Sequence, residues 1–284
     1  MSGGEILFLG AIAGLTIFLG LPIGRLRRPA PRLKSFLNAV SIGILVFLLY
    51  DVLGKAVDPV NTALSRASAG HGGWGRFAEL AAVMAAGLVV GLMALVYYDR
   101  YQATRRPLRA VGAAPAIATS RSHTRLDFVS RLDAPERLAF FIALGIGLHN
   151  FGEGLAIGQS AARGELRLAT VLIVGFALHN ATEGFGICGP LAADGRRPSW
   201  GFLGAMGLIG GGPTFLGTVV GQSVANDLLF TAFLALAAGS ILYVVMELVG
   251  VAKKMGYKEV VMWGVLLGVT LGFATDMVLV AAGA

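Results

Sequence analysis

Two short stretches of the sequence carry the same chemical groups in the same order. Residues 149–154 read His-Asn-Phe-Gly-Glu-Gly, and residues 179–184 read His-Asn-Ala-Thr-Glu-Gly. Imidazole and carboxylate groups together suit Zn, Fe, Mn, Co or Ni better than they suit Ca or Mg. The repeated motif therefore predicts a site for a divalent transition metal ion.

The spacing within each motif suits a helix. The histidine and the glutamate are four residues apart, so the side chains of His149 and Glu153 would share one face of a helix, and those of His179 and Glu183 would do the same. The asparagine after each histidine lies about 100° further round. Two neighbouring antiparallel helices could thus direct all of these groups at one point. The predicted metal ligands of this pair are His149, Asn150, Glu153, His179, Asn180 and Glu183.

The segments that carry the motifs are apolar enough to lie in a membrane. Of the 284 residues, 56% are hydrophobic and 14% are charged, whereas soluble domains are usually about a quarter charged. A membrane-spanning helix needs about 20 mainly apolar residues. We expect an all-α polytopic membrane protein with eight transmembrane helices in a single transmembrane domain, residues 1–284. The expected helices are 5–24, 36–56, 77–98, 137–160, 168–190, 199–222, 227–250 and 258–283.

The basic residues indicate how these helices are oriented. Eighteen Lys and Arg residues fall in one alternating set of connections, and five fall in the other. The basic side is cytoplasmic by the positive-inside rule, so both termini are expected outside the cytoplasm. Residues 99–136 would form a flexible basic cytoplasmic loop. Topology thus explains the net charge of +7, and no nucleic-acid partner is predicted. We expect an integral protein of the cytoplasmic membrane of a prokaryote.

Buried charge makes a bound partner necessary. A carboxylate at the centre of a bilayer costs roughly 2.5–3.5 kcal/mol on insertion scales, and this chain places two there. A metal ion is the preferred partner. The alternatives are a clasp without an ion, in which the histidine of one helix pairs with the glutamate of the other, and a proton relay. Asp51 and Glu247 lie late in their helices and suit either a pathway or an interfacial position, while Asp276 lies deeper.

Glycine is abundant, with 41 residues, and it recurs at intervals of four. Small residues allow membrane helices to approach closely, so these stripes predict a tight bundle. They are Gly10/Gly14, Gly87/Gly91, Gly217/Gly221 and Gly264/Gly268/Gly272. The glycines at 152, 154, 184 and 186 would allow close approach at the motifs or a local break in the helix.

The motifs resemble those of the ZIP (Zrt/Irt-like) family of divalent metal transporters. That family's fourth helix carries His-Asn-x-Pro-Glu-Gly, which residues 149–154 match except at the proline. Its fifth helix carries a related motif that falls on residues 179–184, and its seventh carries a stretch similar to Gly239–Val244 followed by Glu247. Gly152 and Thr182 stand where the family has proline, so the chain resembles a divergent member.

The resemblance implies a function. It implies inward transport of divalent metal ions, Zn first and then Fe, Mn, Co or Cd, through a site between helices 4, 5 and 7. It also implies that Asn150 and Asn180 help to bind a second ion, which shares the carboxylates with the first. Asp51 and Glu247 would act as pathway ligands. One group of helices would slide against another, and the assembly would be a homodimer. The chain is then not an enzyme. A membrane-embedded metalloenzyme, such as a hydrolase, and a metal sensor without transport are the alternatives.

Overall fold

The computed structural model describes residues 3–25, 31–105, 129, 132–162, 164, 166–194, 197–223 and 226–282. Their regular structure is entirely helical. The first helix, α1 (Gly3–Leu15), is followed by two 3₁₀ segments, η1 (Thr16–Leu19) and η2 (Leu21–Arg25). The remaining helices are α2 (Pro31–Ser68), α3 (Trp74–Arg105), α5 (Ala134–Ala162), α6 (Leu166–Asp194), α7 (Trp200–Gly221), α8 (Asp227–Met255) and α9 (Lys258–Ala282).

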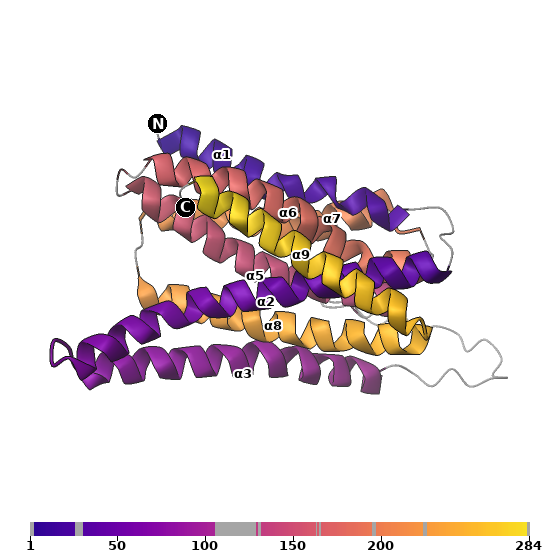
Figure 1. Ribbon diagram of the computed structural model, residues 1–284, viewed down its shortest axis with the longest axis horizontal. Coiled ribbons are helices and arrows are strands. Elements are labelled where there is room, and N and C mark those ends of the chain that lie inside the picture. Colours follow the sequence, from indigo (N-terminus) through magenta and orange to yellow (C-terminus); the bar gives the residue numbers. More distant parts are fainter. Residues whose placement is uncertain are drawn as a thin grey trace, which may run out of the picture.

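Each expected helix range contains helical structure. Among the described residues, seven segments are long and apolar enough to cross a membrane, which shows an integral membrane protein. These seven do not include α6, so the count of eight membrane-spanning helices stays a prediction. Both chain termini lie at one end of the bundle (Figure 1), which we call the terminus end; the opposite end is the loop end. An even number of crossings requires this arrangement, but which side of the membrane each end faces also stays a prediction.

The first expected helix, 5–24, is interrupted. Regular α-helix ends at Leu15, and the chain continues to Arg25 in 3₁₀ turns. The hydroxyl of Thr16 donates to the carbonyl of Ala13 at 2.6 Å, and Gly20 and Pro22 follow within the next turn or two. A hydroxyl that bonds to the backbone competes with the helix, and proline removes an N–H donor. The expected span 5–24 is therefore helical and apolar enough to cross a membrane, but it changes from α-helix to 3₁₀ turns after Leu15.

Two other boundaries differ from expectation. Helix α2 continues to Ser68 rather than ending near residue 56, so most of the expected connection to residue 77 is helical. Lys55 is consequently part of a long membrane helix. Helix α3 continues to Arg105, and α5 begins at Ala134, which shortens the expected loop 99–136 from both sides. Residues 106–128, 130 and 131 of that loop lie outside the described residues.

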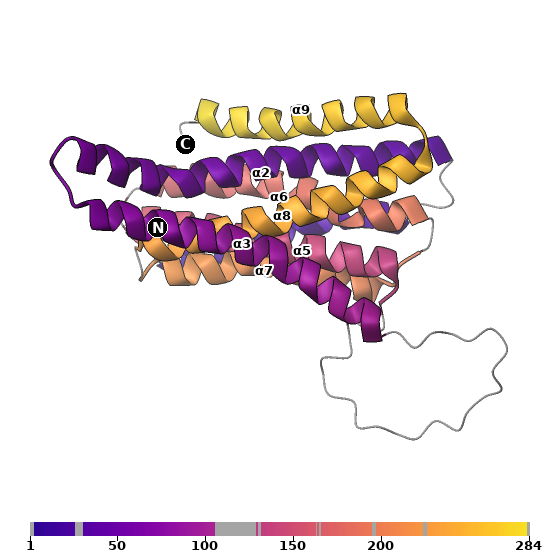
Figure 2. The ribbon, with the colours of Figure 1, turned by 90° about the horizontal axis from the view of Figure 1, so that it is seen from below.

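The helices form two groups. In the first, α5 packs extensively against α7, and α1 against α7 and α6; in the second, α2 packs against α9 and α3 against α8. Figure 2 shows α9 alongside α2 at one edge of the bundle. The two groups meet where α8 contacts α5 and where α6 contacts α2 and α9.

Glycine stripes join the helices within each group, as the sequence predicted. A Cβ atom added at Gly14 would collide with the backbone of α7, one at Gly91 with that of α8, and one at Gly268 with that of α2. Between the groups the nearest atoms are side-chain atoms: a Cβ at Gly152 would lie 2.6 Å from the Leu234 side chain, and one at Gly145 would lie 3.4 Å from that of Ser240. Close backbone packing therefore belongs to the groups themselves, and the boundary between them is made by side chains.

Candidate metal centre

Helices α5 and α6 bring the first motif and the glutamate of the second together. The two helices follow one another in the chain and pack against each other. Nε2 of His149 lies 3.1 Å from Oε1 of Glu153 and 3.9 Å from Oε1 of Glu183. All three side chains are buried. One imidazole and two carboxylates from two helices thus converge in the interior, as the four-residue spacing predicted.

Asn150 connects this cluster to a third helix. Its amide nitrogen donates to Oε2 of Glu183 at 2.9 Å and to the carbonyl oxygen of Gly210 in α7 at 3.0 Å. Asn150 therefore both orients the Glu183 carboxylate and joins α5 to the backbone of α7.

Asn180 connects α6 to the interruption in the first membrane segment. Its amide nitrogen donates to the carbonyl oxygen of Ala13 at 2.9 Å. Ala13 belongs to the last turn of α1, where carbonyl groups lose their helical donors as the chain changes to 3₁₀ geometry. The break in the first segment is thus tied directly to the second motif, a link that the sequence did not reveal.

The two amide oxygens point to a missing positive partner. Because a backbone carbonyl can only accept, each asparagine must present its nitrogen to that carbonyl, and this fixes the amide orientation. The Oδ1 atoms of Asn150 and Asn180 are then buried and accept no hydrogen bond from the described residues. A buried acceptor without a donor costs about 1–3 kcal/mol. Asn150 also contacts the Glu183 carboxylate, and amide and carboxylate oxygens are both ligands that a cation can use.

His179 and Glu183 are four residues apart in α6 as expected, but the side chain of His179 lies outside the described part of the chain. Among the described side chains, no group of three or more His, Cys, Asp and Glu residues could hold a metal ion on its own. His149, Glu153 and Glu183 lie close together but do not form such a group. The ligand role of these residues therefore stays a prediction.

The motif glycines serve close approach, and the helices run through them without a break. A Cβ at Gly154 would collide with the carbonyl of Thr214 in α7, and one at Gly184 with the carbonyl of Ile17 in η1. Gly186 has no atom within 4 Å of such a Cβ. Of the two expectations for these glycines, close approach is confirmed at 154 and 184, and both helices continue past Gly152 and Thr182, where the family has proline.

A cavity of about 310 Å³ reaches the cluster from the terminus end. His149 and Glu153 lie at its inner part, and Phe230 and Val280 lie near the ends of α8 and α9. Lys55 and Asp276 also line it. The sequence analysis counted Lys55 among the basic residues of a connection and did not predict its place in the cavity. Its position four residues after Asp51, inside an apolar segment that continues beyond residue 56, could have indicated this place.

Asp51 does not line this cavity. Its carboxylate accepts a hydrogen bond from the Lys55 ammonium at 2.7 Å, one turn further along α2. The Asp51 side chain is 14% exposed. The predicted pathway ligand is thus in contact with a lysine, and that lysine reaches the cavity.

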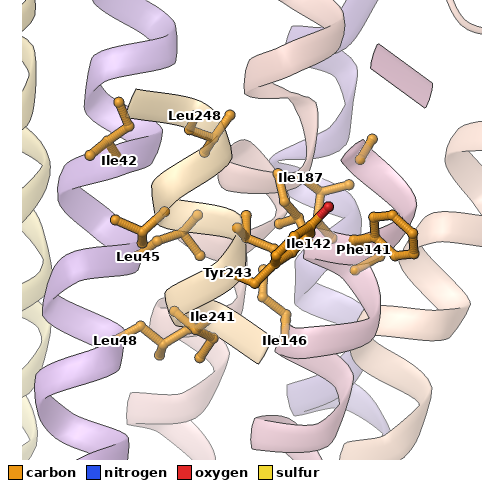
Figure 3. Close-up of a cluster of buried hydrophobic side chains, with 14 of the residues drawn as sticks. Ile42, Leu45, Leu48, Phe141, Ile142, Ile146, Ile187, Ile241, Tyr243 and Leu248 are labelled. Carbon is orange, nitrogen blue, oxygen red and sulfur yellow. The ribbon is translucent and has the colours of Figure 1, made fainter. Parts of the chain in front are cut away.

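A cluster of apolar side chains separates His149, Glu153 and Glu183 from the loop end. Figure 3 shows Ile42, Leu45 and Leu48 of α2 facing Ile241 and Leu248 of α8. Tyr243 of α8 points instead toward Phe141 of α5, next to Ile142, Ile146 and Ile187 of α5 and α6. Along α5, Phe141 and His149 are eight residues apart, which corresponds to about 12 Å of helix. The cluster thus closes the route from the cavity to the loop end.

Glu247 lies on the far side of this apolar cluster. It lines a different cavity of about 420 Å³ at the loop end, together with Arg137, Tyr243 and Lys254. Thirteen residues of α8, or about 20 Å, separate it from Leu234 beside His149. The predicted ligands therefore fall into a central cluster and one distant acidic residue, and the structure does not bring Glu247 to the centre.

Comparison with known proteins gives a consistent set of relatives. The chain is similar to zinc transporters named ZupT, among them those of Salmonella paratyphi A, Salmonella newport and Salmonella agona. Each is 28% identical over 277 residues, and the match covers 93% of this chain and 93% of the relative. No family model matches the chain.

Proposed function

Because the motifs and the similarity to zinc transporters along nearly the whole chain support membership of the ZIP family, we propose that this protein moves zinc across a membrane, toward the cytoplasm. Iron, manganese, cobalt and cadmium are the next candidate substrates. The relatives are named as transporters, which favours transport over the hydrolase and sensor alternatives. The cytoplasmic membrane of a prokaryote is the proposed location, and a homodimer the proposed assembly.

The observation that carries this proposal is the buried cluster on α5 and α6. His149, Glu153 and Glu183 come together in the interior, and the oxygens of Asn150 and Asn180 are left without described donors. We propose that His149, Glu153, His179 and Glu183 bind the ion. A second ion beside Asn150 and Asn180, as the resemblance implies, stays a prediction. Asp51 and Glu247 are proposed as pathway residues at successive depths.

The packing supports movement of one helix group against the other. Backbone contacts through glycine make each group a compact unit, whereas side chains fill the boundary between them. The cavity approaches the cluster from the terminus end, and apolar side chains close the way to the loop end. Displacement of the group that holds α5 and α6 would carry the ion past this apolar cluster toward Glu247. The sliding implied by the resemblance therefore has a physical basis in this chain.

Zinc uptake into proteoliposomes tests the proposal. We expect purified wild-type protein to take up zinc, and Glu153→Gln and Glu183→Gln to abolish uptake because each removes a charged ligand. Glu259→Gln is a matched control, since Glu259 is an exposed glutamate in the first turn of α9. Full uptake by both cluster variants would refute the proposed site. Binding of zinc without uptake by the wild type would favour the sensor alternative.

A further inference from the structure

One charged side chain in the cavity has no place in the proposed binding of metal. Lys55 lines the same cavity as His149, Glu153 and Asp276. Its ammonium bonds to Asp51 at 2.7 Å and lies 5.7 Å from the centre of the Phe176 ring. A permanent positive charge thus stands on the route by which a metal ion would reach the cluster.

The position of Lys55 relates it to both groups of helices. Lys55 and Asp51 belong to α2, whereas Phe176 and Glu153 belong to α6 and α5 of the other group. An ammonium within about 6 Å of an aromatic ring is attracted to its face. Lysine also carries its charge on a flexible four-carbon stem with three donors. The ammonium therefore lies at the boundary between the two groups, bonded to Asp51 of one group and close to an aromatic ring of the other.

The charges in the cavity explain what such a side chain would do. The carboxylates of Glu153 and Asp276 line the cavity together with the Lys55 ammonium, and charge at membrane depth is costly unless opposite charges lie close together. The ammonium and an entering metal ion would repel each other. Asp51, one helical turn away, holds the ammonium at the cavity wall.

We propose that Lys55 is a resident counter-cation of the metal cavity. Held by Asp51 at the wall of the cavity, its ammonium offsets part of the negative charge of the cavity carboxylates and repels an entering metal ion. It therefore weakens metal binding and favours release. This inference rests on the proposed function of the His149–Glu153 cluster.

Equilibrium titration of zinc into the purified full-length protein tests it. We expect Lys55→Gln and Lys55→Met to bind zinc roughly tenfold more tightly than the wild type, since pairing with Asp51 offsets only part of the repulsion that is removed. Lys55→Arg keeps the charge and should bind like the wild type. Lys253→Gln, which removes an exposed lysine at the loop end of α8, is the control and should also bind like the wild type.

The kinetics of zinc transport give a second measurement, which would not change if Lys55 had only a structural role. In proteoliposomes Lys55→Gln should lower the KM for zinc and also lower the maximal rate, because release becomes slower. Unchanged or weaker zinc affinity in both neutral variants, with elution and thermal stability like the wild type, would overturn the inference and leave the proposed function standing. A wild type that binds no zinc would overturn both.

Discussion

The motif glycine at position 184 offers a sharp test of how the fold holds the metal cluster. Gly184 follows Glu183 directly, and a Cβ atom there would collide with the backbone carbonyl of Ile17 in η1. A backbone carbonyl cannot move aside by changing rotamer, so in Gly184→Ala helix α6 must separate from η1. Gly186→Ala is the matched control, because the same atom added two residues later meets nothing within 4 Å.

The structure sets the expected magnitudes. Forcing an extra methyl group into a packed interior costs about 1–3 kcal/mol, which corresponds to a fall of about 3–8 °C in the midpoint of thermal unfolding for a chain of this size. Gly186→Ala should leave the midpoint unchanged or raise it, since alanine is favoured over glycine in helices by up to about 1 kcal/mol. Displacing α6 also moves Glu183 away from Asn150, and loss of such supporting contacts typically weakens metal binding by about 10–100-fold.

Both quantities can be measured on the same preparations. Thermal unfolding in detergent, followed by size-exclusion chromatography, gives the midpoint, and zinc titration gives the affinity. We expect Gly184→Ala to lower both the midpoint of thermal unfolding and the zinc affinity, and Gly186→Ala to lower neither. If the two variants were equally stable and bound zinc equally well, close approach at Gly184 would not be what positions the cluster.

Three further changes test separate parts of the structure. Ile146→Ser should increase zinc leakage into vesicles, read with an internal zinc dye, because a hydroxyl admits water to the apolar cluster; an unchanged rate would show that the barrier lies elsewhere. Asn180→Ala should lower the thermal midpoint, since it removes one of the hydrogen bonds to the Ala13 carbonyl, at a cost of about 0.5–1.5 kcal/mol; a midpoint equal to that of the wild type would contradict this. Glu247→Gln should leave the zinc affinity unchanged by titration while slowing uptake, because Glu247 lies about 20 Å along α8 from the centre; weaker binding would place it at the metal.

The central cluster was predictable because its geometry is local. The side chains of His149 and Glu153 meet since residues four apart share a helix face, and the short connection after α5 makes α6 its antiparallel neighbour. Hydropathy likewise located the helices, since a membrane requires long apolar segments. Glycine stripes at four-residue intervals indicated which faces would pack, although they could not name the partner helices.

The remaining features depend on contacts between distant segments. Gly20 and Pro22 disfavour a regular helix near the end of residues 5–24, but they do not fix its last residue, because part of the stabilisation comes from Asn180, 167 residues from Ala13 in the chain. The extension of α2 beyond residue 56 passes through Asp58 and Pro59, which usually indicate the end of a helix. Lys55 lies within the expected helix 36–56 but was counted only among the charges that orient the helices, so its relation to the cavity was missed. Glu247 was predicted as a pathway ligand by resemblance, and only the course of α8 shows how far it lies from the central cluster.

The charge of the cluster limits how many metal ions it can hold at once. When ionised, Glu153 and Glu183 contribute two negative charges, whereas Asn150 and Asn180 offer neutral amide oxygens. One divalent ion balances the two carboxylates. A second would leave two positive charges in a buried site, where uncompensated charge costs several kcal/mol per ion. Lys55 adds a positive charge that Asp51 offsets, so the nearby pair supplies no surplus of negative charge. The single negative charge of Asp276 does not balance the two positive charges of a further ion. The donor set thus argues for one ion at a time, and a purified wild-type protein that binds two zinc ions per chain would contradict this argument.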